Sequence, residues 1–193
     1  MITDVQITGT QILSDNKYTL KKITYSYTRA DGSHTTQARE VYDRGDGAVI
    51  LLYNSQQRTV ILTRQFRLPT YVNGNTTGML IEACAGLLDG DTPEACVVRE
   101  SMEETGYSIR DVQKVYEIYM SPGAVTEKLY FFVAAYTPAM KQEDGGGAEG
   151  EEENIDVLEV PFDKAMQMLA QGEIQDAKTI ILLQYVKIHN LVG

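Results

Sequence analysis

The fold of this chain is decided by one stretch, which reads Gly86-Leu87-Leu88-Asp89-Gly90-Asp91-Thr92-Pro93-Glu94-Ala95-Cys96-Val97-Val98-Arg99-Glu100-Ser101-Met102-Glu103-Glu104-Thr105-Gly106-Tyr107. A glycine-bearing loop opens the stretch, and the residues that follow predict a helix over 92–105. Thr92 suits the N-cap of this helix, Pro93 suits its first turn, and Gly106 suits its C-terminal exit. We therefore expect a loop followed by a well-capped helix in the middle of the chain.

Three carboxylates lie on one side of the predicted helix. At about 100° per residue, Glu100, Glu103 and Glu104 fall within an arc about 100° wide. The opposite side, which we expect to be buried, carries Ala95, Val98, Met102 and Thr105. Like charges at this spacing repel by roughly 0.2–0.5 kcal/mol per pair, so a solvated acidic face is one interpretation. The glycine-bearing loop favours the other, a divalent cation held by carboxylates and loop carbonyls.

Composition and charge exclude several other classes of protein. The 193 residues are 43% hydrophobic and 23% charged, which is typical of a globular chain. The net charge of −10 disfavours nucleic acids and anionic membranes as partners. The apolar runs are too short to span a bilayer, and the start has no apolar core of a secretory signal. Because Cys84 and Cys96 form no disulfide framework, we expect a cytoplasmic protein in which both are small, buried apolar groups.

The remaining patterns predict a mixed α/β architecture. Strands are expected over 18–29, 34–42, 48–53, 59–66, 79–83, 112–119, 128–136 and 155–160, with Asp31-Gly32 as a hairpin turn. Two further helices are expected over 162–171 and 177–191, whereas 67–78 and the acidic, glycine-rich 138–154 read as loops, the second of them flexible. The apolar strands 48–53 and 59–66 should be central, and the polar strand 34–42 should not face a core on both sides. A boundary near residue 44 would separate an N-terminal β-domain, 1–44, from a main domain, 45–193.

The stretch 86–107 resembles the Nudix box. In that family a glycine and an acidic residue precede Arg-Glu, two further residues, Glu-Glu, any residue and Gly. Residues 99–106 fit this second half, with Ser101 where the family usually has an apolar residue. The first half is one residue shorter than usual, and Asp91 stands nearest the usual glutamate. The similarity extends over 12–16, 39–45, 64–67, 120–123, 172–174 and 178–179 to bacterial GDP-mannose pyrophosphatases, relatives of the ADP-ribose pyrophosphatases.

The resemblance implies a fold and an activity. The fold would be the Nudix fold, an α/β/α sandwich with a mixed sheet, plus a small N-terminal antiparallel β-domain exchanged within a homodimer. The activity would be Mg²⁺-dependent hydrolysis of a nucleotide sugar, with Mn²⁺ as a possible substitute and with GDP-mannose giving GMP and mannose 1-phosphate. ADP-ribose is the alternative substrate. A non-catalytic Nudix-fold sensor of nucleotide sugars is the alternative from another class, against which the intact glutamates argue.

The resemblance also implies the metal ligands and the base. The ligands would be Glu100, Glu104, the Ala85 carbonyl and Glu153. Glu103 would be a further ligand or would be held by Arg99. The general base is expected on the acidic loop. Counting back from the strand at 155–160 selects Glu153, with Glu152 beside it and Glu103 as a third candidate.

Substrate contacts are implied at eight positions. These are Lys17, Arg39, Glu40, Arg67, Gly86, Leu87, Glu127 and Lys178. Arginine and lysine suit this role because a diphosphate has outer oxygens that metal ions do not cover. An arginine can donate two parallel hydrogen bonds to such oxygens.

Overall fold

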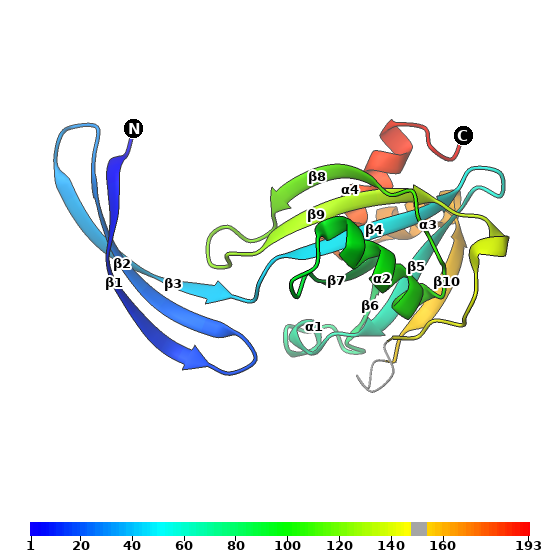
Figure 1. Ribbon diagram of the computed structural model, residues 1–193, viewed down its shortest axis with the longest axis horizontal. Helices are drawn as coiled ribbons and strands as arrows, with labels where there is room; N and C mark the ends of the chain where they lie inside the picture. The colour runs from blue at the N-terminus through cyan, green and yellow to red at the C-terminus, as the bar shows by residue number, and fades with distance from the viewer. Residues whose placement is uncertain (148–153) are drawn as a thin grey trace. The chain divides into compact units, whose positions relative to one another are not determined.

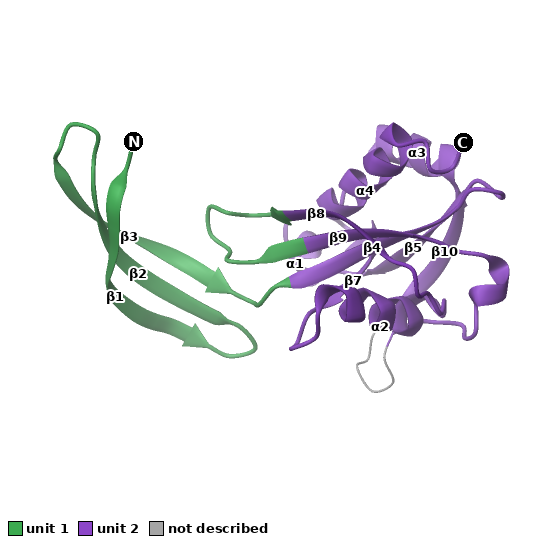
Figure 2. Ribbon diagram, turned by 45° about the horizontal axis from the view of Figure 1, so that its top comes forward, with its two compact units in different colours: residues 1–46, 118–129 green, residues 47–117, 130–193 purple. Residues whose placement is uncertain are grey.

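The computed structural model describes residues 1–147 and 154–193, and the chain divides into two compact units. Unit 1 comprises Met1–Asp46 and Ile118–Leu129, and unit 2 comprises Gly47–Glu117 and Tyr130–Gly193 (Figure 2). Among the helices in the described residues, none is long and apolar enough to cross a membrane.

Unit 1 contains a three-stranded antiparallel sheet in the order β1–β2–β3 (Figure 1). Its strands are β1 (Thr3–Asp15), β2 (Thr19–Thr28) and β3 (His34–Asp43). The β2–β3 hairpin turns at Asp31 and Gly32, as predicted, with Gly32 at φ +82°. The expected strands did not include β1. Three register shifts interrupt its pairing with β2, which blurs the alternation by which a strand is identified from sequence.

The sheet of unit 1 has almost no core of its own. Within residues 1–46, all of which the structure describes, only Tyr27 is buried. The polar strand β3 has no buried residue, as the sequence predicted. Strand β1 exposes large apolar side chains, among them Val5, Ile7 and Ile12. A sheet this small and this exposed on its own is marginally stable in water.

The main sheet has the strand order β10–β5–β4–β9–β8, with β6 beside β5 and β7 beside β4. Strands β4 and β5 each have neighbours on both sides, which confirms the prediction that they are central. The strands are β4 (Gly47–Asn54), β5 (Thr59–Phe66), β6 (Met79–Glu82), β7 (Cys84–Leu87), β8 (Gln113–Tyr119), β9 (Lys128–Ala135) and β10 (Asp156–Pro161).

Helices cover both faces of this sheet. Helix α2 (Pro93–Thr105) lies on one face, and α3 (Phe162–Gln171) and α4 (Ala177–Ile188) lie on the other (Figures 1 and 2). Because side chains alternate along a strand, Ala48, Ile50 and Leu52 of β4 share one face, and they pack in one cluster with Cys96 and Val97 of α2. The α/β/α sandwich expected from the sequence is confirmed.

The segment 67–78, expected to be a loop, contains a short helix. Helix α1 (Leu68–Val72) begins after Arg67, with Pro69 in its first turn. Asn75 closes the segment, because its side-chain amide donates to the Met79 carbonyl (3.0 Å) and its side-chain oxygen accepts from the Gly78 N–H (3.2 Å). A helix of five residues is too short to show a 3.6-residue period in sequence.

The segment 138–147 is anchored to α2, so the expectation of a flexible loop is wrong for this part. After the 3₁₀-helix η1 (Pro138–Met140), the N–H groups of Gly146 and Gly147 donate to the carbonyls of Glu104 (3.0 Å) and Glu103 (3.1 Å). These bonds satisfy carbonyls that a helix leaves unpaired at its C-terminus. A Cβ atom on Gly145 would lie 2.5 Å from the Glu104 carbonyl oxygen, so the approach requires a glycine.

Candidate active site

Helix α2 begins and ends as the sequence predicts. The Thr92 hydroxyl accepts a hydrogen bond from the Ala95 N–H (3.2 Å), and Pro93 occupies the first turn. At the other end Gly106 has φ +75° and donates its N–H to the Met102 carbonyl (2.9 Å). Both ends of the helix are therefore fixed by local hydrogen bonds, and these fix the backbone positions from which the glutamates project.

The buried side of α2 is rotated from the expected one. Thr105 is buried as predicted, but Ala95 is exposed and Val98 is only partly buried. The buried residues of the helix are Cys96, Val97, Ser101, Glu104 and Thr105. This rotation arises because β4 and β7 pack against the side that carries Glu104, which is only 4% exposed. The carboxylate face and the buried face thus overlap instead of opposing each other.

The backbone of β7 lies against two of the glutamates. The Ala85 N–H donates to Glu104 Oε2 (3.3 Å). A Cβ atom on Gly86 would lie 1.8 Å from Glu100 Oε1, so a side chain at this position would displace the Glu100 carboxylate. The structure therefore brings together Ala85, Glu100 and Glu104, which the sequence analysis expected to be metal ligands, and Gly86, which it expected to contact substrate.

Arg99 connects the acidic residues of the loop and the helix. Its Nη1 donates to Glu100 (2.8 Å) and Glu103 (2.9 Å), and its Nε donates to Asp91 (3.2 Å). The expected contact between Arg99 and Glu103 is present, and Asp91, nearest the family's front glutamate, also binds Arg99. Although desolvation lowers the pKa of Arg99, attraction from Glu100 and hydrogen bonds to Asp91 and Glu103 leave that pKa raised.

These residues fit a hard divalent cation by their chemistry. Magnesium prefers oxygen ligands and is commonly held by one or two carboxylates together with water and substrate phosphates. Glu100, Glu104 and the carbonyl of Ala85 offer such oxygens, and the absence of a side chain at Gly86 lets the Glu100 carboxylate lie against the strand backbone. Within the described residues no group of three or more His, Cys, Asp or Glu side chains forms a ready metal site.

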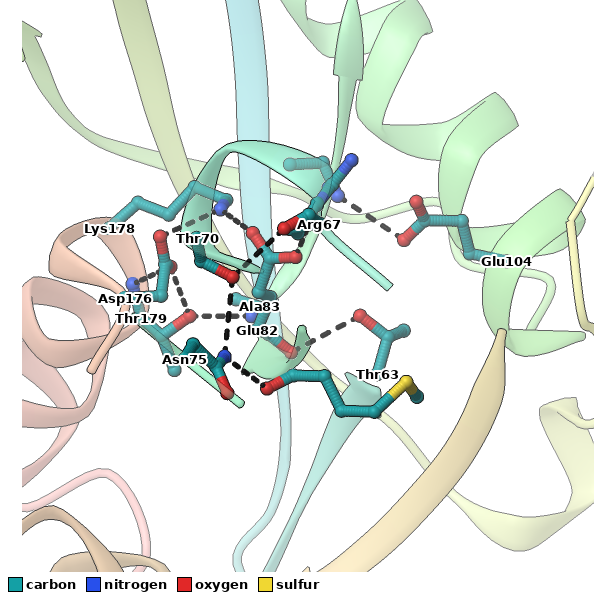
Figure 3. Close-up of polar contacts among 12 residues, drawn as sticks. Thr63, Arg67, Thr70, Asn75, Glu82, Ala83, Glu104, Asp176, Lys178 and Thr179 are labelled. Carbon is teal, nitrogen blue, oxygen red and sulfur yellow. Dashed lines mark hydrogen bonds and ion pairs between the residues drawn. The ribbon is translucent and has the colours of Figure 1, made fainter. Parts of the chain in front are cut away.

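A second cluster joins the two predicted substrate cations of unit 2. Glu82, at the end of β6, is 3% exposed and accepts from Arg67 Nε (2.6 Å) and from Lys178 Nζ. Figure 3 shows Arg67 between Glu82 and Glu104. Desolvation lowers the pKa of Arg67, but attraction from Glu82, Glu104 and Asp176 leaves it raised.

Asp176 fixes the start of α4 in this cluster. It caps the helix by accepting from the Thr179 N–H (2.9 Å) and hydroxyl (2.6 Å), and it also binds Lys178 Nζ (2.9 Å). The Thr179 hydroxyl in turn accepts from the Ala83 N–H (2.6 Å). Lys178 is therefore held from two sides and is only 14% exposed.

Sequence reasoning missed Glu82, Asp176 and Thr179. A signal existed for Glu82, because a carboxylate inside an apolar strand must find a partner when it is buried. The partners could not be read from the sequence, since Lys178 is 96 residues away. A signal also existed for Asp176. A helix was expected to start at residue 177, and an aspartate directly before a helix is a typical N-cap.

The two cysteines are free and buried, as predicted. Burial and the nearby Glu104 raise the pKa of Cys84 well above its ordinary value. Burial and Glu100 raise the pKa of Cys96 to about 12. Both thiols are therefore protonated at neutral pH and behave as packing groups, not as nucleophiles.

Unit 1 holds the other four predicted substrate residues. Glu127 is 15% exposed and pairs with Arg44 (3.5 Å), whose guanidinium lies over the Tyr18 ring (5.5 Å). Lys17 also lies over Tyr18 (5.8 Å), so Lys17 and Glu127 belong to one cluster. Arg39 is exposed and donates to the Ala38 carbonyl and to the Gln37 side chain, and Glu40 beside it is exposed. Two of the three predicted bases, Glu152 and Glu153, lie outside the described residues.

Known proteins resemble this chain over nearly its whole length. Residues 4–42 match the family described as "GDP-mannose pyrophosphatase NudK N-terminal domain", and residues 43–183 match the NUDIX domain. The chain is 54% identical to a GDP-mannose pyrophosphatase of Enterobacter sp. (strain 638), with all of both chains covered. It is 53% identical to the Klebsiella pneumoniae subsp. pneumoniae enzyme of that name, covering 100% of this chain and 96% of the relative.

A solved structure shows the same fold at low sequence identity. It is titled "Crystal structure of ADP compounds hydrolase" and has a TM-score of 0.70 and 16% identity, covering 97% of this chain and 96% of that one. At this identity the likeness speaks for the fold alone, and the arrangement of sheet and helices is shared over nearly the full length.

Proposed function

Because the chain belongs to the NUDIX family and is more than half identical to GDP-mannose pyrophosphatases over its full length, we propose that it hydrolyses GDP-mannose to GMP and mannose 1-phosphate. The observation that carries the proposal is the meeting of Glu100 and Glu104 with the backbone of Ala85 and Gly86. A regulatory sensor would need no such constellation, and the Arg99 contacts that orient it are also complete.

NUDIX hydrolases use divalent metal ions, and we propose Mg²⁺ here, with Mn²⁺ as a substitute. Glu100, Glu104 and the Ala85 carbonyl would hold the ion, and Glu153 is proposed as a further ligand from the sequence alone. When bound, such an ion offsets charge on the diphosphate and lowers the pKa of water. The chain's own part is to orient the glutamates, which the Ala85 N–H does for Glu104 and Arg99 does for Glu100.

The remaining unit 2 residues would bind the diphosphate. Arg67 and Lys178 carry the positive charges, and Gly86 and Leu87 offer the close approach of a strand backbone. The proton acceptor for the attacking water is proposed to be Glu153, with Glu152 and Glu103 as the other candidates. Glu103 is bound by Arg99 (2.9 Å), which favours an acceptor outside the helix.

We propose that two copies of the chain form a homodimer in which Lys17, Arg39 and Glu40 reach the partner's substrate. Support comes from unit 1, in which Tyr27 is the single buried side chain within the fully described residues 1–46. A sheet that leaves Val5, Ile7 and Ile12 exposed gains stability when a second copy covers it. Glu127 would lie at the same substrate, and Arg44 pairs with it at 3.5 Å.

The proposal includes a cytoplasmic site of action and no nucleic-acid partner. Both rest on composition, since the formal net charge is −10 and both cysteines are free. Cell fractionation with an antibody to the chain tests the first, and a filter-binding assay with labelled DNA and RNA tests the second.

The deciding experiment is a substrate panel read by product identity. GDP-mannose, ADP-ribose, GDP-glucose and UDP-glucose are each incubated with the protein and Mg²⁺, with EDTA as the control. We expect GDP-mannose to have the highest kcat/KM and to yield GMP and mannose 1-phosphate. A severalfold preference for ADP-ribose would overturn the substrate but keep the reaction class. Binding of nucleotide sugar without any product would indicate a sensor.

A further inference from the structure

Three elements of unit 2 deliver their charged side chains to one buried carboxylate. Arg67 precedes α1, Lys178 lies in the first turn of α4, and Glu82 ends β6 (Figure 3). Glu82 is 3% exposed, and each of its two oxygens accepts from a different cation. We propose that Glu82 is a positioning residue that aims Arg67 and Lys178 at the diphosphate of the substrate. This inference rests on the proposed function of the two cations.

Some N–H donors of Arg67 and Lys178 are used within the cluster, and others remain for a ligand. Arg67 binds Glu82 through Nε, at the inner end of its guanidinium, so the fork of terminal nitrogens is oriented by that bond. Lys178 gives one donor to Glu82 and one to Asp176, and an ammonium group has three. Each cation is therefore held in place. Arg67 also faces Glu104 (Figure 3), and its remaining N–H groups, like the third N–H of Lys178, can donate to an anion.

The cluster carries no excess of positive charge. Arg67 and Lys178 contribute two positive charges, Glu82 and Asp176 contribute two negative charges, and Glu104, which also attracts Arg67, contributes a third. An excess of positive charge therefore does not explain why this cluster would bind a diphosphate. What the cluster supplies is orientation, since flexible side chains that are held in advance lose less entropy on binding.

Glu82 could act on the two cations by neutralising their charge or by orienting them, and one variant distinguishes the two roles. If Glu82 only neutralised the cations, Glu82→Gln would add one net positive charge and tighten the binding of an anionic substrate. If Glu82 positions them, the same variant weakens binding, because each cation uses a different Glu82 oxygen and glutamine replaces one of these acceptors with an NH₂ donor. The substitution keeps the size of the side chain, and Glu82→Asp keeps the charge while it shortens the reach.

The experiment compares KM and kcat for GDP-mannose at saturating Mg²⁺. We expect Glu82→Gln and Glu82→Asp each to raise KM about tenfold and to change kcat less than about threefold, because binding common to ground and transition state is lost. Glu159→Gln is the matched control, since Glu159 also accepts two hydrogen bonds in unit 2, from Tyr136 (2.7 Å) and Thr59 (3.1 Å), and should leave KM unchanged. An unchanged or lower KM in Glu82→Gln overturns the inference. If that variant does not fold, as judged by its melting temperature, Glu82→Asp decides alone.

A background without the two cations tests whether Glu82 acts through them. In a chain carrying Arg67→Gln and Lys178→Met, adding Glu82→Gln should raise KM no further. An additional tenfold rise would show that Glu82 acts by another route and would overturn the inference.

Binding of inorganic pyrophosphate separates this inference from the proposed function. Isothermal titration with pyrophosphate and Mg²⁺ needs no turnover. We expect Glu82→Gln to bind about tenfold more weakly than the wild type. That result would stand even if no nucleotide sugar in the panel were hydrolysed, in which case only the proposed function fails. Equal affinity in both proteins, or no binding by the wild type, overturns the inference while the substrate panel is unaffected.

Discussion

The two units of this chain use strands in opposite ways. Strands β1, β2 and β3 of unit 1 are 13, 10 and 10 residues long, yet within these strands, all described, only Tyr27 is buried. Strand β4 of unit 2 has eight residues, and all but Tyr53 are buried. Strands of both units form through local sequence pattern and pairing, but only β4 is covered on both faces by packed side chains. Strand length therefore says little about how firmly a side chain is held.

The candidate site residues follow the same division. In unit 2, Glu82 and Glu104 are less than 5% exposed and each has a hydrogen-bond donor from another element. In unit 1, Arg39 is exposed, and its hydrogen bonds go to its neighbours Ala38 and Gln37 on the same strand. The residues proposed as metal ligands are thus held by packed elements of unit 2, whereas Arg39, proposed to bind substrate, lies on the open sheet of unit 1.

The largest effect is expected in unit 2, from Glu104→Gln. The amide keeps the shape of the side chain and can still accept from the Ala85 N–H, but it removes the charge that a divalent ion requires. Loss of even an outer contact to a metal ligand costs about 10–100-fold, so kcat/KM for GDP-mannose should fall by at least about 10². The melting temperature should change little. The matched control is Glu94→Gln, on the exposed first turn of the same helix, which should keep full activity. Near-normal rates for Glu104→Gln at saturating Mg²⁺ would remove Glu104 from the ligand set.

The second-largest effect is expected when two inactive variants, one changed in unit 1 and one in unit 2, are mixed. In the proposed dimer, Arg39→Ala damages the unit 1 half of a site and Glu104→Gln damages the unit 2 half. After random exchange half the dimers are hybrids, and one of the two sites in each hybrid is intact. Activity should therefore return to roughly a quarter of the wild-type value. The measurement is the GDP-mannose rate before and after the two inactive variants are mixed under mild denaturant.

Two results bear on that prediction separately. Mixing Arg39→Ala with itself is the control and should restore nothing. A monomer in sedimentation analysis that is fully active would contradict the dimer, and a dimer without recovery on mixing would place Arg39 at its own chain's site.

The parts of the site that sequence reasoning predicted are those with local signals. The caps of α2 at Thr92 and Gly106 depend on residues three or four positions away, so they could be identified. The side on which α2 is buried depends on β4 and β7, so Ala95 was placed wrongly and Glu104 was found buried. The bonds from Glu82 to Arg67 and Lys178 span 15 and 96 residues. Only the packed sheet brings such partners together.

A third prediction compares glycines of the same conformation in the two units. Gly106 in unit 2 and Gly32 in unit 1 have φ of +75° and +82°. A Cβ on Gly106 would lie 2.0 Å from the Glu143 carbonyl oxygen, whereas a Cβ on Gly32 would meet nothing within 4 Å. Gly32→Ala should therefore cost only the conformational term of about 1–2 kcal/mol. Gly106→Ala adds a clash with backbone and should cost about 4 kcal/mol or more in the free energy of unfolding.

Urea unfolding followed by circular dichroism measures both costs. Gly172 is the control within unit 2, because it ends helix α3 with φ +77° and has nothing within 4 Å of an added Cβ. Gly172→Ala should match Gly32→Ala. Equal costs for Gly106→Ala and Gly172→Ala would mean that residues 142–147, which pack on the end of α2, can move away from the added Cβ without loss of stability.

The smallest effect is expected from the ion pair between Lys21 and Asp43 in unit 1. The hydrogen bond from Lys21 Nζ (3.0 Å), followed by the Gly45 N–H, lowers the pKa of Asp43 below its ordinary value of 3.8. A carboxyl whose pKa is lower in the folded state stabilises the fold above its unfolded pKa, and this stabilisation is lost as the pH falls through the folded pKa. Because the Asp43 side chain is 41% exposed, solvent screens the pair, and Asp43→Asn should cost no more than about 1 kcal/mol at pH 7. At pH 2.5 the variant and the wild type should differ less in urea midpoint than at pH 7. A difference that does not shrink in acid would mean that Asp43 stabilises unit 1 through its uncharged contacts with Gly45 and Thr126.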